Sequence, residues 1–208
     1  MLMKFSQFDL LNTCNLTNTG NIFNKFFESK YISLFIKIPE NDLKRGLMLV
    51  SDVNDLLKAE KEKNIIFTIE KLMNILYLDF IKQVTTGIDN GKYIDLKKVA
   101  DTLKNEIKQY NLTREFKQIE PNHYAYQDIS NAKNIDKSCF VKIKILKKWV
   151  LRGEVFLQDI IDKFQPLDIT TVEELISLRY RCVINEVKEG NYQILYSIVK
   201  NILNNSEI

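Results

Sequence analysis

Residues 65–84 read IIFTIEKLMNILYLDFIKQV and carry the clearest helical pattern of the chain. Their apolar side chains recur at spacings of three and four residues, which places them on one face of an α-helix. The run Thr85-Thr86-Gly87 ends the pattern, and IDNGKY at 88–93 is typical of a turn. The predicted apolar face consists of Ile65, Ile66, Ile69, Leu72, Met73, Leu76, Phe80, Ile81 and Val84.

Two more helices are expected between residues 95 and 132. Asp95 is a suitable N-cap for the first of them. The next is expected to begin at Pro121 and to run through YAYQDISNA (124–132), because proline is well tolerated in a first helical turn. The apolar face of the helix that follows Asp95 consists of Leu96, Val99, Leu103, Ile107 and Tyr110.

The segment that follows predicts two short helices separated by a glycine. The apolar residues within 141–150, among them Val141, Ile145 and Trp149, are placed on a fourth helix that Gly153 breaks. A fifth helix, over 155–164, is closed by Pro166, which cannot continue a helix.

Two helices complete the chain. Thr170 and Glu173, in the sequence TTVE, match a capping box, in which a hydroxyl and a carboxylate satisfy free amide donors. The helix that they open is expected to extend to about Val187. Gly190 separates it from a last helix over 194–203.

These elements predict an all-α fold, a helical bundle of about six to eight helices. The six glycines and three prolines are few for a fold rich in tight turns, which also favours helices. Residues 63–208 form the predicted main body. Residues 1–62 are interpreted as an N-terminal extension packed on it, with a strand or a short helix within 22–39 and a helix over 41–62.

The charges favour no single class of partner. The net charge is +3, from 30 basic and 27 acidic residues that are mostly interspersed, as on solvated helix faces. The run KIKILKKW (142–149) is the best sequence argument for nucleic acid. On a helix, however, its lysines share one face in ordinary amphipathic fashion, so no nucleic-acid partner is predicted and a nucleic-acid-binding or regulatory module is kept as the alternative function.

No catalytic site, cofactor, metal or small-molecule substrate is predicted. The sequence contains none of the common nucleotide-binding, zinc-protease or hydrolase motifs. His123 is the single histidine and has no catalytic neighbour in sequence. The three cysteines are far apart and form no metal-binding pair. The apolar stretch 31–36 is much shorter than the roughly 20 residues of a membrane helix.

Several motifs after residue 133 resemble the cytoplasmic domain of the DotU/TssL family of secretion-system proteins. In order, they are Asn134-Ile135-Asp136, Trp149, the sequence RGEVFL at 152–157, VEELISLRYRC at 172–182 and EGNY at 189–192. The resemblance covers about 125 residues, from Leu72 to about Tyr196. Lys137 stands where the family has a glutamate, and Leu157 replaces a phenylalanine.

The resemblance implies two packed three-helix bundles and a non-enzymatic structural component of a type VI secretion membrane complex. Such a protein links an IcmF/TssM-like inner-membrane protein to cytoplasmic baseplate components, and a homodimer is possible. It is held at the cytoplasmic face of the bacterial inner membrane by a C-terminal anchor, which would begin about where this chain ends. The residues implied in partner binding are Asp136, Arg152, Glu154 and Phe156; the competing interpretation places Phe156 in the core and Glu154 at a helix cap.

Overall fold

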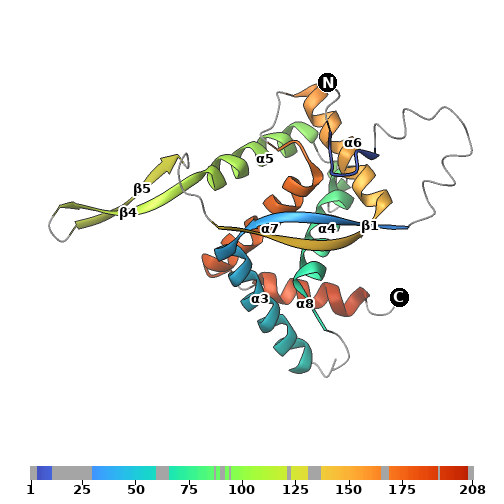
Figure 1. Ribbon diagram of the computed structural model, residues 1–208. Helices are drawn as coiled ribbons and strands as arrows, with labels where there is room; N and C mark the ends of the chain where they lie inside the picture. Colours follow the sequence, from blue (N-terminus) through green and yellow to red (C-terminus); the bar gives the residue numbers. More distant parts are fainter. Residues whose placement is uncertain are drawn as a thin grey trace, which may run out of the picture.

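The computed structural model describes residues 4–10, 30–59, 66–86, 88–89, 92–93, 95–120, 123–130, 137–164, 169–191 and 193–205 (Figure 1). These residues are mostly helical, as predicted. None of their helices is long and apolar enough to cross a membrane.

The helices agree with most of the predicted ones. The stretch at 65–84 forms α4, Asp95 accepts a hydrogen bond from the Lys97 amide (2.9 Å) at the start of α5, and Gly190 separates α7 from α8. The bounds are α3 (Glu40–Ala59), α4 (Ile69–Thr86), α5 (Leu96–Asn111), α6 (Lys147–Lys163), α7 (Val172–Lys188) and α8 (Gln193–Asn205).

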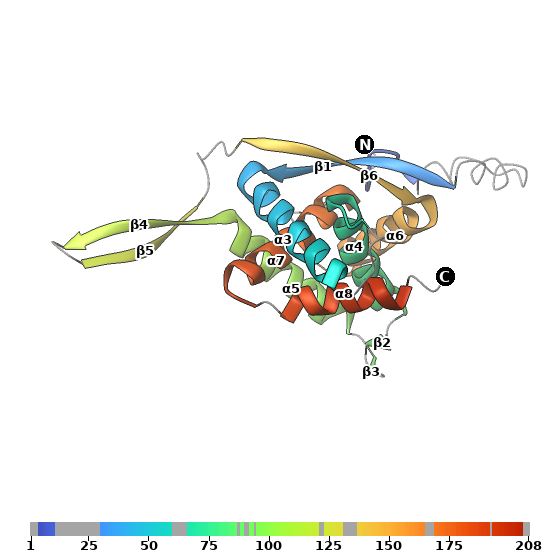
Figure 2. The ribbon, with the colours of Figure 1, turned by 90° about the horizontal axis from the view of Figure 1, so that it is seen from below.

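Three antiparallel strand pairs show that the prediction of an all-α fold is wrong. In the principal pair, called the ribbon below, β1 (Tyr31–Pro39) lies beside β6 (Ser138–Leu146) over nine residues. The strands β4 (Leu112–Glu120) and β5 (His123–Ser130) form a hairpin that projects from the helices (Figures 1 and 2). A short pair consists of β2 (Ile88–Asp89) and β3 (Lys92–Tyr93).

The prediction of a helix over 141–150 is wrong. The apolar residues of this segment fit both the helical period and the alternating period of a strand. Val141 and Ile145 fit a helix, but Val141, Ile143 and Ile145 also alternate with polar residues as in a strand. β-branched side chains favour the strand, and pairing with β1 selects it. The helix expected from Pro121 is also wrong, because residues 123–130 form β5.

Gly153 does not break a helix. It lies within α6, which runs without interruption to Lys163. Pro166, predicted to close this element, lies outside the described residues.

The ribbon covers the helical layer with one of its two faces. Its inward side chains alternate along both strands and contact α3, α4 and α7 beneath (Figure 2). Burying such a side chain contributes about 1.5–3 kcal/mol. The ribbon thus joins β1, from the first 62 residues, and the later helices in one core; the domain boundary at residue 62 stays a prediction. The inward side chains are Ile32, Leu34, Ile36, Ile38, Val141, Ile143 and Ile145.

Two glycine–tyrosine contacts set how closely the helices approach. The Tyr77 hydroxyl on α4 donates to the Trp149 carbonyl on α6 (2.9 Å), four residues before Gly153. The Tyr180 hydroxyl on α7 donates in the same way to the Asp42 carbonyl on α3 (2.9 Å), four residues before Gly46. Burial raises the pKa of both hydroxyls, so both stay protonated donors at neutral pH.

The glycines in these contacts have no room for a side chain. A Cβ atom at Gly153 would lie 2.1 Å from the Tyr77 hydroxyl oxygen and 3.0 Å from Cγ2 of Val172. A Cβ atom at Gly46 would lie 1.8 Å from the Tyr180 hydroxyl oxygen. Each tyrosine therefore fills the space that a glycine leaves on the neighbouring helix.

Gly153→Ala is expected to lower the free energy of unfolding by about 1–3 kcal/mol, because the clash displaces Tyr77 and breaks its hydrogen bond. Alanine's higher helix propensity, worth about 1 kcal/mol, offsets only part of this loss. Chemical denaturation measures the change. Val155→Ala, at an exposed position of the same helix, is the control and should change stability much less. A Gly153→Ala variant as stable as the wild type would contradict the close contact.

Candidate functional site

The outer face of the ribbon, opposite the helices, carries three exposed aromatic side chains. Tyr31, Phe35 and Phe140 are 45%, 47% and 67% exposed. Successive side chains of a strand point to opposite faces, so the alternation that buries isoleucines inward directs these rings outward. None of the described helices covers this face in Figure 2. Large apolar groups that gather on a surface usually mark a binding site.

Lysines lie beside these aromatic rings on the same face. In the antiparallel register Phe35 is opposite Lys142, and Phe140 is opposite Lys37. The Lys144 ammonium lies 5.1 Å from the centre of the Tyr31 ring, within cation–π range. Aromatic and basic side chains therefore lie next to one another along the ribbon.

The ribbon concentrates the positive charge of the molecule. Backbone hydrogen bonds extend the pairing at both ends, from the Lys147 amide to the Lys30 carbonyl (3.0 Å) and from the Glu40 amide to the Lys137 carbonyl (2.8 Å). Residues 30–39 and 137–148 contain seven lysines and no acidic residue. Because the whole chain carries +3, the rest of it carries a net charge of −4.

Side chains from other parts of the chain form hydrogen bonds with the backbone at both edges of the ribbon. The Gln7 carboxamide donates to the Phe35 carbonyl (3.1 Å) and accepts from the Phe35 amide (3.2 Å) on the edge of β1. Ser177 donates to the Lys37 carbonyl (2.8 Å), and Asn74 donates to the Lys144 carbonyl (3.1 Å) on the edge of β6. Because side chains of the chain itself bind these edge positions, a partner reaches the outer face without displacing them.

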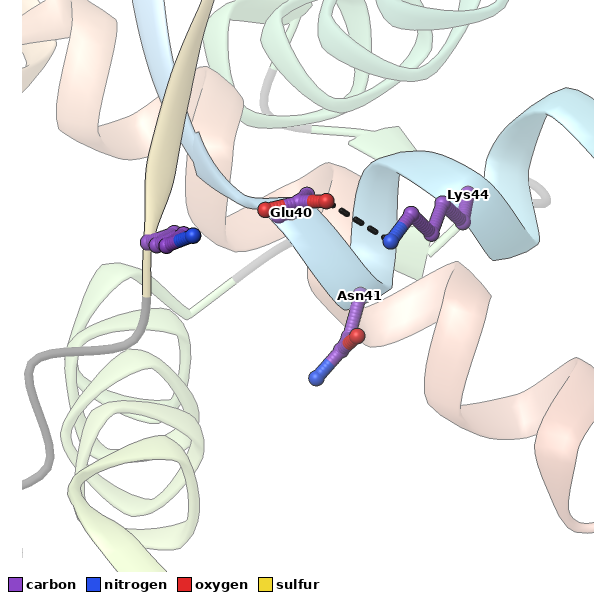
Figure 3. Close-up of a pocket in the computed structure, with 4 residues that line it drawn as sticks. Glu40, Asn41 and Lys44 are labelled. Atoms are coloured by element: carbon purple, nitrogen blue, oxygen red, sulfur yellow. Dashed lines mark ion pairs between the residues drawn. The ribbon is translucent and has the colours of Figure 1, made fainter.

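Two surface pockets border the ribbon. The smaller, of about 180 Å³, is lined by Glu40, Asn41, Lys44 and Lys137 (Figure 3). Its Glu40–Lys44 ion pair, 2.7 Å long, raises the pKa of the exposed Lys44 ammonium and so keeps it charged. A second pocket of about 390 Å³ lies between β1 and α7, and its lining includes Phe35, Phe140, Glu173 and Arg181.

The structure does not bring the four predicted partner-binding residues together on one surface. Asp136 lies outside the described residues. Arg152 is exposed, with its guanidinium 4.6 Å from the centre of the Trp149 ring. Glu154 is 0% exposed, and Phe156 is 4% exposed with its ring edge-to-face against Phe80 at 5.5 Å. Of the three described residues, only Arg152 is accessible to a partner in this conformation.

Two buried carboxylates bind the N-terminal residues instead. Glu154 accepts hydrogen bonds from the Ser6 hydroxyl and from the Leu10 amide (3.0 Å). Glu173 accepts from the Gln7 amide (2.9 Å). Burial is the main cause that raises the pKa of Glu173 above its usual range.

The capping box is displaced by one residue from its predicted position. The overlapping sequence TTVEE contains two possible boxes, and the structure uses Thr171 with Glu174, whose amide lies 3.3 Å from the threonine hydroxyl oxygen. Glu173, predicted to cap the helix, is thereby free to turn inward. No pattern in the sequence indicated its contact with residue 7, which is 166 positions away.

The described residues contain no cluster of histidine, cysteine, aspartate or glutamate side chains that could hold a metal ion. Comparison with known protein families, curated proteins and solved structures finds no match.

Replacing Glu173 with glutamine is expected to change stability in a pH-dependent way. Because folding raises the pKa of Glu173, its ionisation costs stability as the pH rises through the folded-state value, and protonation at lower pH removes that cost. The stability of Glu173→Gln relative to the wild type should therefore be greater at pH 8 than at pH 5. Denaturation of both proteins at the two pH values measures this difference. If the variant is instead more stable, relative to the wild type, at pH 5 than at pH 8, burial does not raise the pKa of the Glu173 carboxylate.

Proposed function

We propose that this protein binds single-stranded nucleic acid on the outer face of the ribbon. The proposal is supported chiefly by one observation: three exposed aromatic rings lie beside three lysines on a face of the ribbon that carries no acidic residue. Bases stack on aromatic side chains, and lysines neutralise the phosphates between them.

The shape of the ribbon fits a single strand better than a duplex. Nine residues per strand, at about 3.3 Å each, give a platform roughly 30 Å long, enough for a short run of nucleotides. Stacking on Phe35 or Phe140 requires the face of a base, which a duplex hides inside its stack. Nothing on this face resembles an array of base-reading side chains, so the proposed binding has little sequence preference.

The double variant Lys142→Glu with Lys144→Glu is expected to weaken binding of a fluorescent oligonucleotide by roughly tenfold or more. It should also reduce the slope of log affinity against log salt by about 1.4, because two phosphate contacts are lost. Fluorescence anisotropy at several salt concentrations measures both. The control is the double variant Lys163→Glu with Lys200→Glu, two exposed charge reversals on α6 and α8 that change the net charge equally and should change binding little. Equal losses in the two double variants would show only an effect of net charge.

Phe35→Ala and Phe140→Ala are each expected to cost about 1–3 kcal/mol of binding free energy without changing the salt slope. Met48→Ala is the control, because Met48 is an apolar side chain, 69% exposed, on α3 away from the ribbon. If both phenylalanine variants bind like the wild type, the aromatic rings do not stack on bases.

A second candidate is a non-enzymatic structural component of a type VI secretion membrane complex, of the DotU/TssL kind. The observation that favours it is that RGEVFL and VEELISLRYRC fall on α6 and α7, which pack against each other around Gly153 and Val172. In that role the helices would form the family's two bundles, bind an IcmF/TssM-like inner-membrane protein and baseplate components, and lie at the inner membrane. The ribbon has no counterpart in the all-α family, which makes this the weaker proposal.

The secretion proposal predicts that the tagged protein, purified gently from membranes of its host, brings a large inner-membrane protein with it. Arg152→Glu should reduce that recovery at least severalfold, because Arg152 is the accessible member of the implied site. Lys163→Glu, an exposed charge reversal at the end of the same helix, is the control. Recovery of nucleic acid without membrane proteins would instead favour the first proposal.

A further inference from the structure

Residues 4–10 lie in a groove formed by α6, α7 and the edge of β1. Phe5 and Leu10 anchor the two ends of this segment and are only 6% and 4% exposed. The Phe5 carbonyl accepts a hydrogen bond from the amide of Val172 (2.8 Å), the first residue of α7. The first amides of a helix have no partner within the helix, so this bond satisfies one that the groove would otherwise leave free.

Ser6 organises the turn between the two anchors. Its hydroxyl donates to the Glu154 carboxylate and accepts from the amides of Phe8 and Asp9, both at 3.1 Å. Leu10 adds a second donor to Glu154. The turn is therefore recognised through its hydroxyl and its backbone, together with its apolar ends.

Gln7 binds the strand edge as a neighbouring strand would. Its amide donates to Glu173, while its carboxamide forms a pair of hydrogen bonds with the backbone of Phe35. Glutamine is suited to this pairing because its side chain carries both a donor and an acceptor.

These contacts are those of a recognition site rather than of plain core packing. Apolar side chains of similar size would stabilise the interior at least as well as two buried carboxylates. The carboxylates add selectivity, because an occupant must bring donors to them. Among the described residues, the buried Oε2 atom of Glu173 has no hydrogen-bond partner. The pocket of about 390 Å³ beside Gln7 and Glu173 also extends the groove beyond its present occupant.

The segment spans six residues, Phe5 to Leu10, and 19 residues separate it from the next described residue, Lys30. The contacts described above use the side chains of Phe5, Ser6, Gln7 and Leu10 and the backbone of the segment. A separate peptide of the same sequence could therefore make the same contacts.

We propose that this groove is a peptide-docking site and that residues 5–10 are its resident occupant, which leaves and returns without unfolding of the helical body. The pattern that it recognises is an aromatic residue, Ser, Gln, a variable residue, a residue that adopts a positive φ as Asp9 does (51°), and Leu. This proposal concerns the edge of β1 and the helices, and it adjoins the outer face of the ribbon, because Phe35 and Phe140 also line the pocket that extends the groove.

Hydrogen exchange on the full-length protein tests whether the segment opens. The amides of Gln7 and Leu10 should exchange through a local opening, at least tenfold faster than the buried amides of α4 and α7. If they exchange only as fast as those core amides, the segment is a permanent part of the core and the proposal is wrong.

A binding measurement tests whether the site accepts a separate peptide. The full-length variant Phe5→Asp with Leu10→Asp should release its own segment and bind a labelled Lys4–Leu10 peptide saturably. A peptide in which Ser6 and Gln7 are replaced by alanine should bind at least tenfold more weakly. A folded variant that binds neither peptide, or binds both equally, would overturn the proposal; if the variant fails to fold, the hydrogen exchange of the wild type decides.

Discussion

The pairing of β1 with β6 is the constraint on which the rest of the molecule depends. It joins two strands that are about a hundred residues apart in sequence and buries the isoleucine-rich face of both on the helices. An isolated two-stranded ribbon is marginally stable at best, and the helices alone would leave their upper surface open to water. The ribbon and the helices therefore stabilise each other. The same alternation that fills the core also determines that Phe35, Phe140 and the lysines face outward.

Beneath the ribbon, the helices are held at close range by the pairing of glycine with tyrosine. Tyr77 and Tyr180 each fill the space above a glycine and bind a carbonyl of the same neighbouring helix. Close approach of α6 to α4 and α7 brings Glu154 and Glu173 into the interior, where the N-terminal segment satisfies them. The molecule thus has two surfaces of opposite character, a basic and aromatic ribbon face and a groove whose polar groups are acidic.

The sequence predicted the helices well where a single apolar period was present, as in α4, α5, α7 and α8. It failed at 138–146, where Val141 and Ile145 fit two periods, and the choice was made by a partner strand that local sequence does not identify. That error also hid the candidate site, because Lys142 and Lys144 share a face with aromatic rings only on a strand. Gly153 was misinterpreted as a break because the tyrosine that fills its space lies on another helix. The contacts of Glu154 and Glu173 with residues 6–10 are likewise fixed by tertiary packing alone.

We propose the outer face of the ribbon as the surface that binds nucleic acid. The most direct test of this proposal is ultraviolet cross-linking of the protein to a short single-stranded oligonucleotide, followed by mass spectrometry of the peptides. The account predicts that cross-links concentrate on peptides containing Tyr31, Phe35 and Phe140, since stacked aromatic rings lie in contact with bases. Cross-links concentrated on the β4–β5 hairpin or on the helices, or none at an oligonucleotide concentration that saturates binding, would contradict it.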